Sequence, residues 1–113
     1  MMNYNNKRFK AVSNSANGDV SENMIFHYRQ EGNIVYCSYS DKDIVYGHLI
    51  GTVDARGVID MSYHQINGMG EIRTGRCLSQ PEVMPDGRIR IFEKWRWTSG
   101  DLSEGSSILE EVV

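Results

Sequence analysis

The stretch RIRIFEKWRWT, residues 88–98, decides the fold because its charged and apolar residues fall on alternate positions. Alternation with a period of two is typical of a β-strand, whose successive side chains point to opposite faces of a sheet. Four long cations cannot share a core, so we predict that the other face of this strand points inward. The outward set is Arg88, Arg90, Lys94 and Arg96, and the inward set is Ile89, Ile91, Glu93, Trp95 and Trp97.

The rest of the chain extends this pattern. Runs rich in Val, Ile, Tyr, Phe, Trp and Thr are separated by turn signals such as Asn17-Gly18 and Asp86-Gly87. No stripe of apolar residues with the period of a helix is present. We therefore predict about eight strands, near residues 7–13, 22–30, 33–40, 44–54, 58–67, 70–80, 88–98 and 105–112.

Short connections between consecutive strands require an antiparallel sheet, because parallel pairs need long crossovers. A meander with one apolar face leaves two open edges unless it closes on itself. We predict an all-β protein, a single antiparallel up-and-down meander closed into a small barrel that forms one domain over residues 1–113. A barrel of about eight strands has an interior that side chains just fill or that holds one small ligand.

The length of each turn fixes which side chains enter the barrel. We expect two-residue turns at 86–87 and 68–69, and a three-residue loop at 55–57 whose last glycine takes a positive φ. These registers place Arg76 beside Glu93 in the lumen, on adjacent strands. They also predict that Ile72, Thr74, Arg76 and Leu78 face inward, and that Val45 and Gly47 do so on an earlier strand.

The predicted lumen is the first candidate site. Its aromatic walls and charged pair suit non-enzymatic binding of a small molecule with a polar group. The alternative is a filled barrel in which Arg76 and Glu93 form a satisfied polar pair. The predicted ligand-binding residues are Tyr28, Tyr63, Arg76, Glu93, Trp95 and Trp97.

The outer face of the predicted barrel offers a second candidate. The same registers place Ile34, Tyr36, Ile44, Tyr46 and Ile50 outside on neighbouring strands, with His48 and His64 opposite each other. Such an apolar patch favours a homodimer interface, although terminal residues that cover it are an alternative. Two histidines without a nearby cysteine or carboxylate are a poor metal site, so we predict no metal. The predicted interface residues are Ile34, Tyr36, Tyr46, His48 and His64.

Composition argues against several other classes. The formal net charge is −3 and the isoelectric point is about 5.5, which disfavours nucleic-acid binding. The outward cations are expected to pair instead with Glu104, Glu110 and Glu111. No phosphate-binding loop, metal motif or nucleophile elbow is present, so we single out no catalytic residue and no cofactor.

The compartment is predicted from what the sequence lacks. The first residues have no apolar core like that of a signal peptide, and no stretch is apolar enough to span a membrane, which predicts a cytoplasmic protein with no membrane contact. Cys37 and Cys77 are then expected to be buried thiols and not a disulfide.

Five segments resemble a family of small bacterial proteins of about this length, and the similarity covers nearly the whole chain. They are SNSANG (13–18), FHY (26–28), VYGHLIG (45–51), YHQ (63–65) and WRWTSG (95–100). The resemblance implies a bacterial cytosolic protein with a lipocalin-like or avidin-like barrel. Members of the family often carry the label N-acetylglutamate synthase, which would imply acetyl transfer. We rank this activity last, because the sequence has no pyrophosphate-binding loop before a helix.

Overall fold

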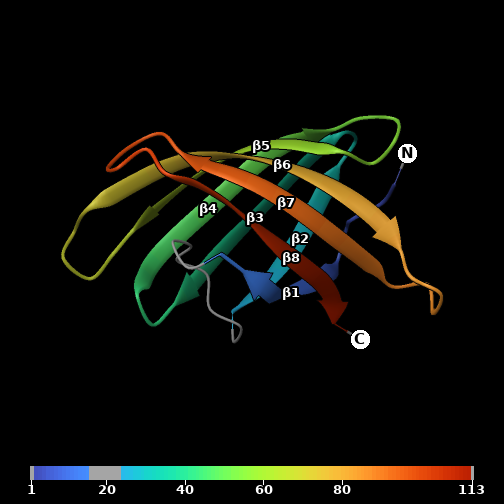
Figure 1. Cartoon of the computed structure of the whole chain (residues 1–113). Coiled ribbons are helices and arrows are strands. Elements are labelled where there is room, and N and C mark those ends of the chain that lie inside the picture. Colours follow the sequence, from blue (N-terminus) through green and yellow to red (C-terminus); the bar gives the residue numbers. More distant parts are fainter. Residues whose placement is uncertain (1, 16–23, 113) are drawn as a thin grey trace.

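The computed structural model describes residues 2–15 and 24–112, and these form eight β-strands (Figure 1). Each strand pairs antiparallel with the next, and β8 also pairs with β1, so the sheet closes into a barrel. The predicted all-β, up-and-down barrel is therefore confirmed. The strands are β1 Lys7–Asn14, β2 Ile25–Glu31, β3 Ile34–Asp41, β4 Ile44–Val53, β5 Ile59–Ile66, β6 Ile72–Val83, β7 Ile89–Trp97 and β8 Glu104–Val112.

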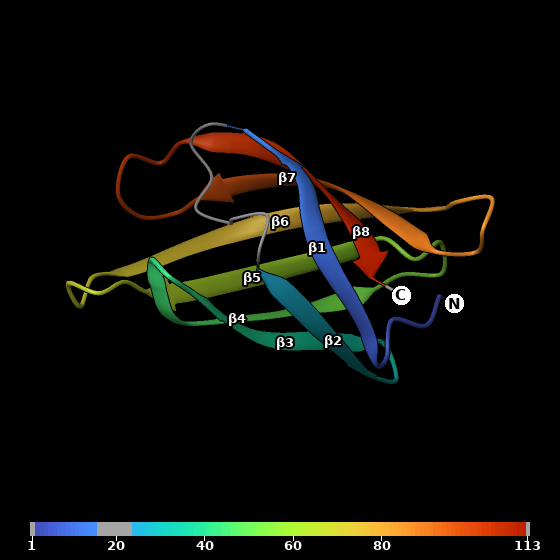
Figure 2. The same cartoon turned by 90° about the horizontal axis from the view of Figure 1, so that it is seen from below.

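The two ends of the barrel differ. The N-terminus and the C-terminus lie at one end, together with the β4–β5 and β6–β7 connections (Figures 1 and 2). We call this the closed end, and the opposite end, with the β5–β6 and β7–β8 connections, the open end. At the closed end, the rings of Tyr4, Phe9 and Tyr28 pack together with centroid separations of 4.9–6.3 Å. The Tyr4 hydroxyl donates to the Gly57 carbonyl at 2.5 Å, which fixes Tyr4 inside the barrel.

Two turns are one residue longer than predicted. The Met84 N–H donates to the Arg88 carbonyl at 2.8 Å, so the β6–β7 loop contains three residues. Its last residue is Gly87, whose φ of 89° lies in the left-handed region that glycine adopts without strain. The β5–β6 loop ends in the same way at Gly70, with φ of 81°. The loop that ends at Gly57 has three residues, as predicted, and a φ of 83°.

The two extra residues change the faces of β6 alone. A shift of one residue turns every side chain of a strand to the other face. Relative to β7, the extra residue in the β6–β7 turn exchanges the inner and outer faces of β6. The extra residue in the β5–β6 turn exchanges the faces again, so Met61 and Tyr63 of β5 point inward as predicted. The predicted inward set of β6 is wrong: Ile72, Arg76 and Leu78 lie outside. Gly75, Cys77 and Ser79 face the lumen in their place, and they pair across β7 with Trp97, Trp95 and Glu93.

A bulge at the start of β4 corrects a second prediction. Tyr39 pairs with Gly47 and Asp41 pairs with Ile44, so two residues of β4 lie opposite a single residue of β3. Ile44 is therefore 1% exposed and part of the core, whereas it was predicted to point outward. Val45, predicted to face the lumen, is 62% exposed.

The outer face of β7 carries its cations as predicted. Arg90 forms an ion pair of 2.9 Å with Glu110, one of the three acids named for this role. Arg88 pairs instead with Asp86, at 2.6 Å, in the preceding turn. Within residues 2–15 and 24–112, no helix is long and apolar enough to cross a bilayer.

Candidate functional site

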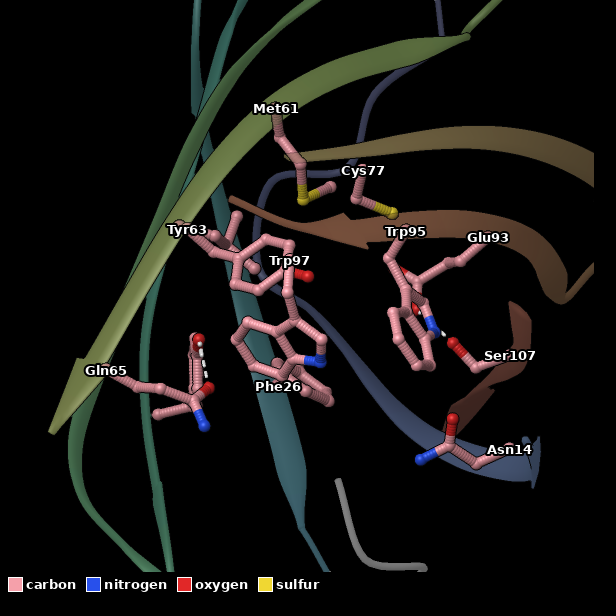
Figure 3. A pocket seen from close by; sticks show the side chains of 12 residues that line it. Asn14, Phe26, Met61, Tyr63, Gln65, Cys77, Glu93, Trp95, Trp97 and Ser107 are labelled. Carbon is pink, nitrogen blue, oxygen red and sulfur yellow. Dashed lines mark hydrogen bonds between the residues drawn. The ribbon is translucent and has the colours of Figure 1, made fainter. Parts of the chain in front are cut away.

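The open half of the barrel contains a cavity of about 60 Å³ (Figure 3). A cavity volume of roughly 10–15 Å³ is enough to hold one water molecule. This cavity therefore has room for several water molecules or a small ligand. Figure 3 shows that Met61 and Cys77 lie at one end of the site and Gln65 and Asn14 at the other. The lining residues are Asn14, Phe26, Tyr39, Leu49, Met61, Tyr63, Gln65, Cys77, Glu93, Trp95, Trp97 and Ser107.

Three glycines keep this cavity open. Each lies directly across the sheet from an aromatic residue: Gly47 from Tyr39, Gly75 from Tyr63, and Gly105 from Trp95. A Cβ atom at any of these glycines would lie far inside van der Waals contact with the opposite ring. The rings therefore lie flat against the barrel wall, where a larger residue would push them into the lumen.

The polar centre of the cavity is the Glu93 carboxyl on β7. The Ser107 hydroxyl donates to its Oε1 at 2.9 Å, and the Ser79 hydroxyl donates to its Oε2 at 3.5 Å. Burial raises the pKa of Glu93 from 4.5 to about 7, and hydrogen bonds from Ser107, Cys77 and Ser79 limit this rise. The carboxyl is thus poised to accept or donate a proton near neutral pH.

Two buried donors in the interior have no hydrogen-bond partner among the described residues. One is Nε1 of Trp97, in the cavity wall, and the other is the Tyr28 hydroxyl, in the closed half. An unsatisfied buried donor costs about 1–3 kcal/mol. Trp97 therefore offers a hydrogen bond to an acceptor that enters the cavity.

Arg73, and not Arg76, is the arginine of β6 that contacts a tryptophan of the cavity wall. Its guanidinium lies 3.8 Å from the ring centroid of Trp97, which is a cation–π contact, and 3.9 Å from Asp101. Arg76 lies on the outer face, where it binds Asp60 at 2.8 Å. The predicted pairing of Arg76 with Glu93 is therefore wrong, because the Gly87 turn has one more residue than expected.

The structure brings most of the predicted lumen residues together. Tyr63, Glu93, Trp95 and Trp97 line the cavity. Tyr28 is fully buried in the barrel interior, but it packs in the closed half and is not among the lining residues. Eight further residues line the cavity and were not selected from the sequence. The recurrence of glycine opposite an aromatic ring is the signal that would have pointed to some of them. The eight are Asn14, Phe26, Tyr39, Leu49, Met61, Gln65, Cys77 and Ser107.

The predicted interface residues all lie on the outer face of β3, β4 and β5. Ile34 and Tyr46 are 44% and 55% exposed. His48 and His64 pair directly across the sheet, with ring centroids 5.8 Å apart. In the described part of the chain, no three His, Cys, Asp or Glu side chains cluster in a way that would hold a metal ion. Cys37 and Cys77 are buried free thiols, as predicted.

We compared the chain with known protein families, curated proteins and solved structures. Neither the curated proteins nor the solved structures contain a match to this chain. The family model described as avidin-like protein matches residues 2–112, which is nearly the entire chain and all eight strands of the barrel. The chain belongs to the avidin-like protein family.

Proposed function

We propose that this protein is a non-enzymatic binding protein that holds a small molecule in the open half of its barrel. The observation that supports this most is the combination, in one cavity, of a partly buried carboxyl at Glu93 and an unpartnered donor at Trp97. A ligand that accepts a hydrogen bond from Trp97 would remove the cost of leaving this donor unpaired in the cavity wall. In the closed half, by contrast, Tyr4, Phe9 and Tyr28 are fully buried and do not line the cavity.

The tryptophans make this proposal easy to test. The chain has two tryptophans, Trp95 and Trp97, and both line the cavity. All tryptophan emission therefore originates at the proposed site. The protein is purified from its source cells under mild conditions, and the compounds bound to it are extracted and identified by mass spectrometry. Each compound is then titrated into ligand-free protein while the tryptophan emission is recorded. A compound that binds in the lumen changes this emission in a saturable way.

Two neighbouring residues of β6 supply a matched pair of variants. Cys77 faces the cavity, whereas Leu78 is 45% exposed on the outer face. Cys77→Met adds bulk to the cavity and is expected to abolish or strongly weaken binding, whereas Leu78→Met leaves it unchanged. Equal binding by both variants, or the absence of any compound that alters the emission, would reject the lumen as a binding site.

A second candidate function is assembly with a second copy of the chain through the outer apolar residues. The exposed fractions of Ile34, Ile50 and Tyr46 are 44%, 49% and 55%, and these residues lie on adjacent strands. Several exposed apolar side chains on one face of a sheet favour protein contact. In that case Tyr46→Glu halves the mass measured by light scattering, whereas Val12→Glu, on β1, does not. A wild-type mass of 12.9 kDa, that of one chain, excludes the homodimer.

A further inference from the structure

We infer that the cavity selects a small organic cation carrying an acceptor oxygen, with its ammonium group against Glu93 and its oxygen on Nε1 of Trp97. This inference rests on the proposed function and names the chemical class of the ligand. It depends on three features of the described lining residues: their charge, their aromatic rings and their unpartnered donor.

The charge of the lining favours a cation. Glu93 is the one acid among the twelve lining residues, and none of them is Lys, Arg or His. A buried carboxylate is costly unless an opposite charge or several hydrogen bonds compensate it. Two serine hydroxyls supply part of this compensation, at 2.9 and 3.5 Å. A cationic ligand would supply the rest.

The groups that surround Glu93 add no competing charge near neutral pH. Cys77 on β6 and Tyr28 on β2 both interact with Glu93, and burial raises the pKa of each, so both stay neutral. Cys37 on β3, which interacts with Tyr28, has its pKa raised by burial to about 12. On β8 the group facing Glu93 is the Ser107 hydroxyl. Asp60, which also acts on Cys77, lies on the outer face in its pair with Arg76.

The aromatic rings favour a cation as well. Five lining residues are aromatic: Phe26, Tyr39, Tyr63, Trp95 and Trp97. Ring faces attract cations, and enclosures of several rings recognise substituted ammonium groups. The Arg73 guanidinium above Trp97 shows that one ring of the set already contacts a cation. Asp101, 3.9 Å from Arg73, partly offsets the charge that this arginine adds at the rim.

The unpartnered donor requires more than a bare cation. An ammonium group has no acceptor, so it would leave Nε1 of Trp97 without a partner. A hydroxyl or carbonyl oxygen elsewhere on the ligand would accept this hydrogen bond. The cavity volume of about 60 Å³ limits such a ligand to few atoms, with any remainder extending toward the open end.

Three small probes separate the contributions of the charge and of the oxygen: choline, dimethylbutanol and propyltrimethylammonium. Dimethylbutanol has a tert-butyl group in place of the trimethylammonium group of choline. Propyltrimethylammonium keeps the charge but lacks the oxygen. Each is titrated at roughly pH 8.5 and pH 5.5, above and below the Glu93 pKa of about 7, with tryptophan emission as the readout. At the higher pH, choline is expected to bind about tenfold or more tightly than dimethylbutanol. It is expected to bind roughly threefold to tenfold more tightly than propyltrimethylammonium. At the lower pH, where Glu93 is protonated, the preference for choline over dimethylbutanol falls to the part that the aromatic rings supply.

Glu93→Gln is the decisive variant, because it keeps the shape of the side chain and removes its charge. The variant is expected to lose most of the preference for choline over dimethylbutanol at both pH values and to keep only the part that the aromatic rings supply. The inference is overturned if dimethylbutanol binds wild type as tightly as choline does at the higher pH, or if the preference for choline is undiminished in Glu93→Gln. If dimethylbutanol alone changes the emission and Cys77→Met prevents this, the proposed binding function stands and the cation is excluded. If no probe changes the emission, the cation inference fails, and the extraction experiment decides the proposed function separately.

Discussion

The closed and open halves of this barrel use similar side chains with opposite results. At the closed end, Phe9 and Tyr28 pack ring against ring at 4.9 Å, and Tyr4 from the N-terminal segment fills the remaining space. At the open end, Tyr63 and Trp95 lie against glycines of the neighbouring strands, and a cavity remains between the rings. At Tyr63 and Trp95, the glycine opposite the ring thus leaves room for the ring to lie against the wall and not across the lumen.

The largest expected effect comes from removing one ring at each end. Phe9 is 0% exposed and surrounded by other rings, so Phe9→Ala is expected to lower the free energy of unfolding by about 3–5 kcal/mol. Tyr63 already borders a cavity and keeps some exposure, so Tyr63→Ala is expected to cost about 1–2 kcal/mol. Urea denaturation measures both values. Equal losses would mean that the two halves are packed alike.

The second effect is the pH dependence caused by Glu93. Its pKa is about 7 in the folded protein, above its ordinary value of 4.5, so the folded state holds the proton more strongly. The stability that this provides is complete below about pH 4.5 and is lost as the pH rises through 7, a change on the order of 3 kcal/mol. Glu93→Gln is expected to remove most of this slope when urea denaturation is repeated between about pH 4.5 and 8.5. Glu71→Gln, in the exposed β5–β6 loop, is the control, and a slope that persists in Glu93→Gln would assign it to another group.

The third effect tests the glycine opposite a ring. In Gly75→Ala the new methyl group would overlap the Tyr63 ring, which must then move into the lumen. We expect a loss of about 1–3 kcal/mol in the free energy of unfolding. The tryptophan emission is also expected to change, because the Tyr63 ring lies 5.3 Å from Trp97. Gly68→Ala, where an added Cβ would meet nothing within 4 Å, is expected to change neither quantity.

The sequence predicted the strands and the closure because alternation and turn residues are local signals. It also predicted the inward face of β7, since four cations on one face leave no other choice. It was wrong on β6 because the chemistry of the turn at Asp86-Gly87 suits both a two-residue and a three-residue loop, and one residue decides the face of Arg76. The mutual arrangement of Arg73 and Trp97 depends on side-chain conformation, which alternation does not encode.

The smallest effect concerns two hydroxyl groups in the same aromatic cluster of the closed end. The Tyr4 hydroxyl donates to the Gly57 carbonyl, so Tyr4→Phe leaves a buried acceptor without this bond and is expected to cost about 1–2 kcal/mol. The Tyr28 hydroxyl has no partner among the described residues, so Tyr28→Phe is expected to leave stability unchanged or to raise it by up to about 1 kcal/mol. Urea denaturation of the two variants, which lose the same atom, measures the difference directly. If Tyr28→Phe costs as much as Tyr4→Phe, an ordered water satisfies Tyr28, and the polar interior then extends from the cavity into the closed half.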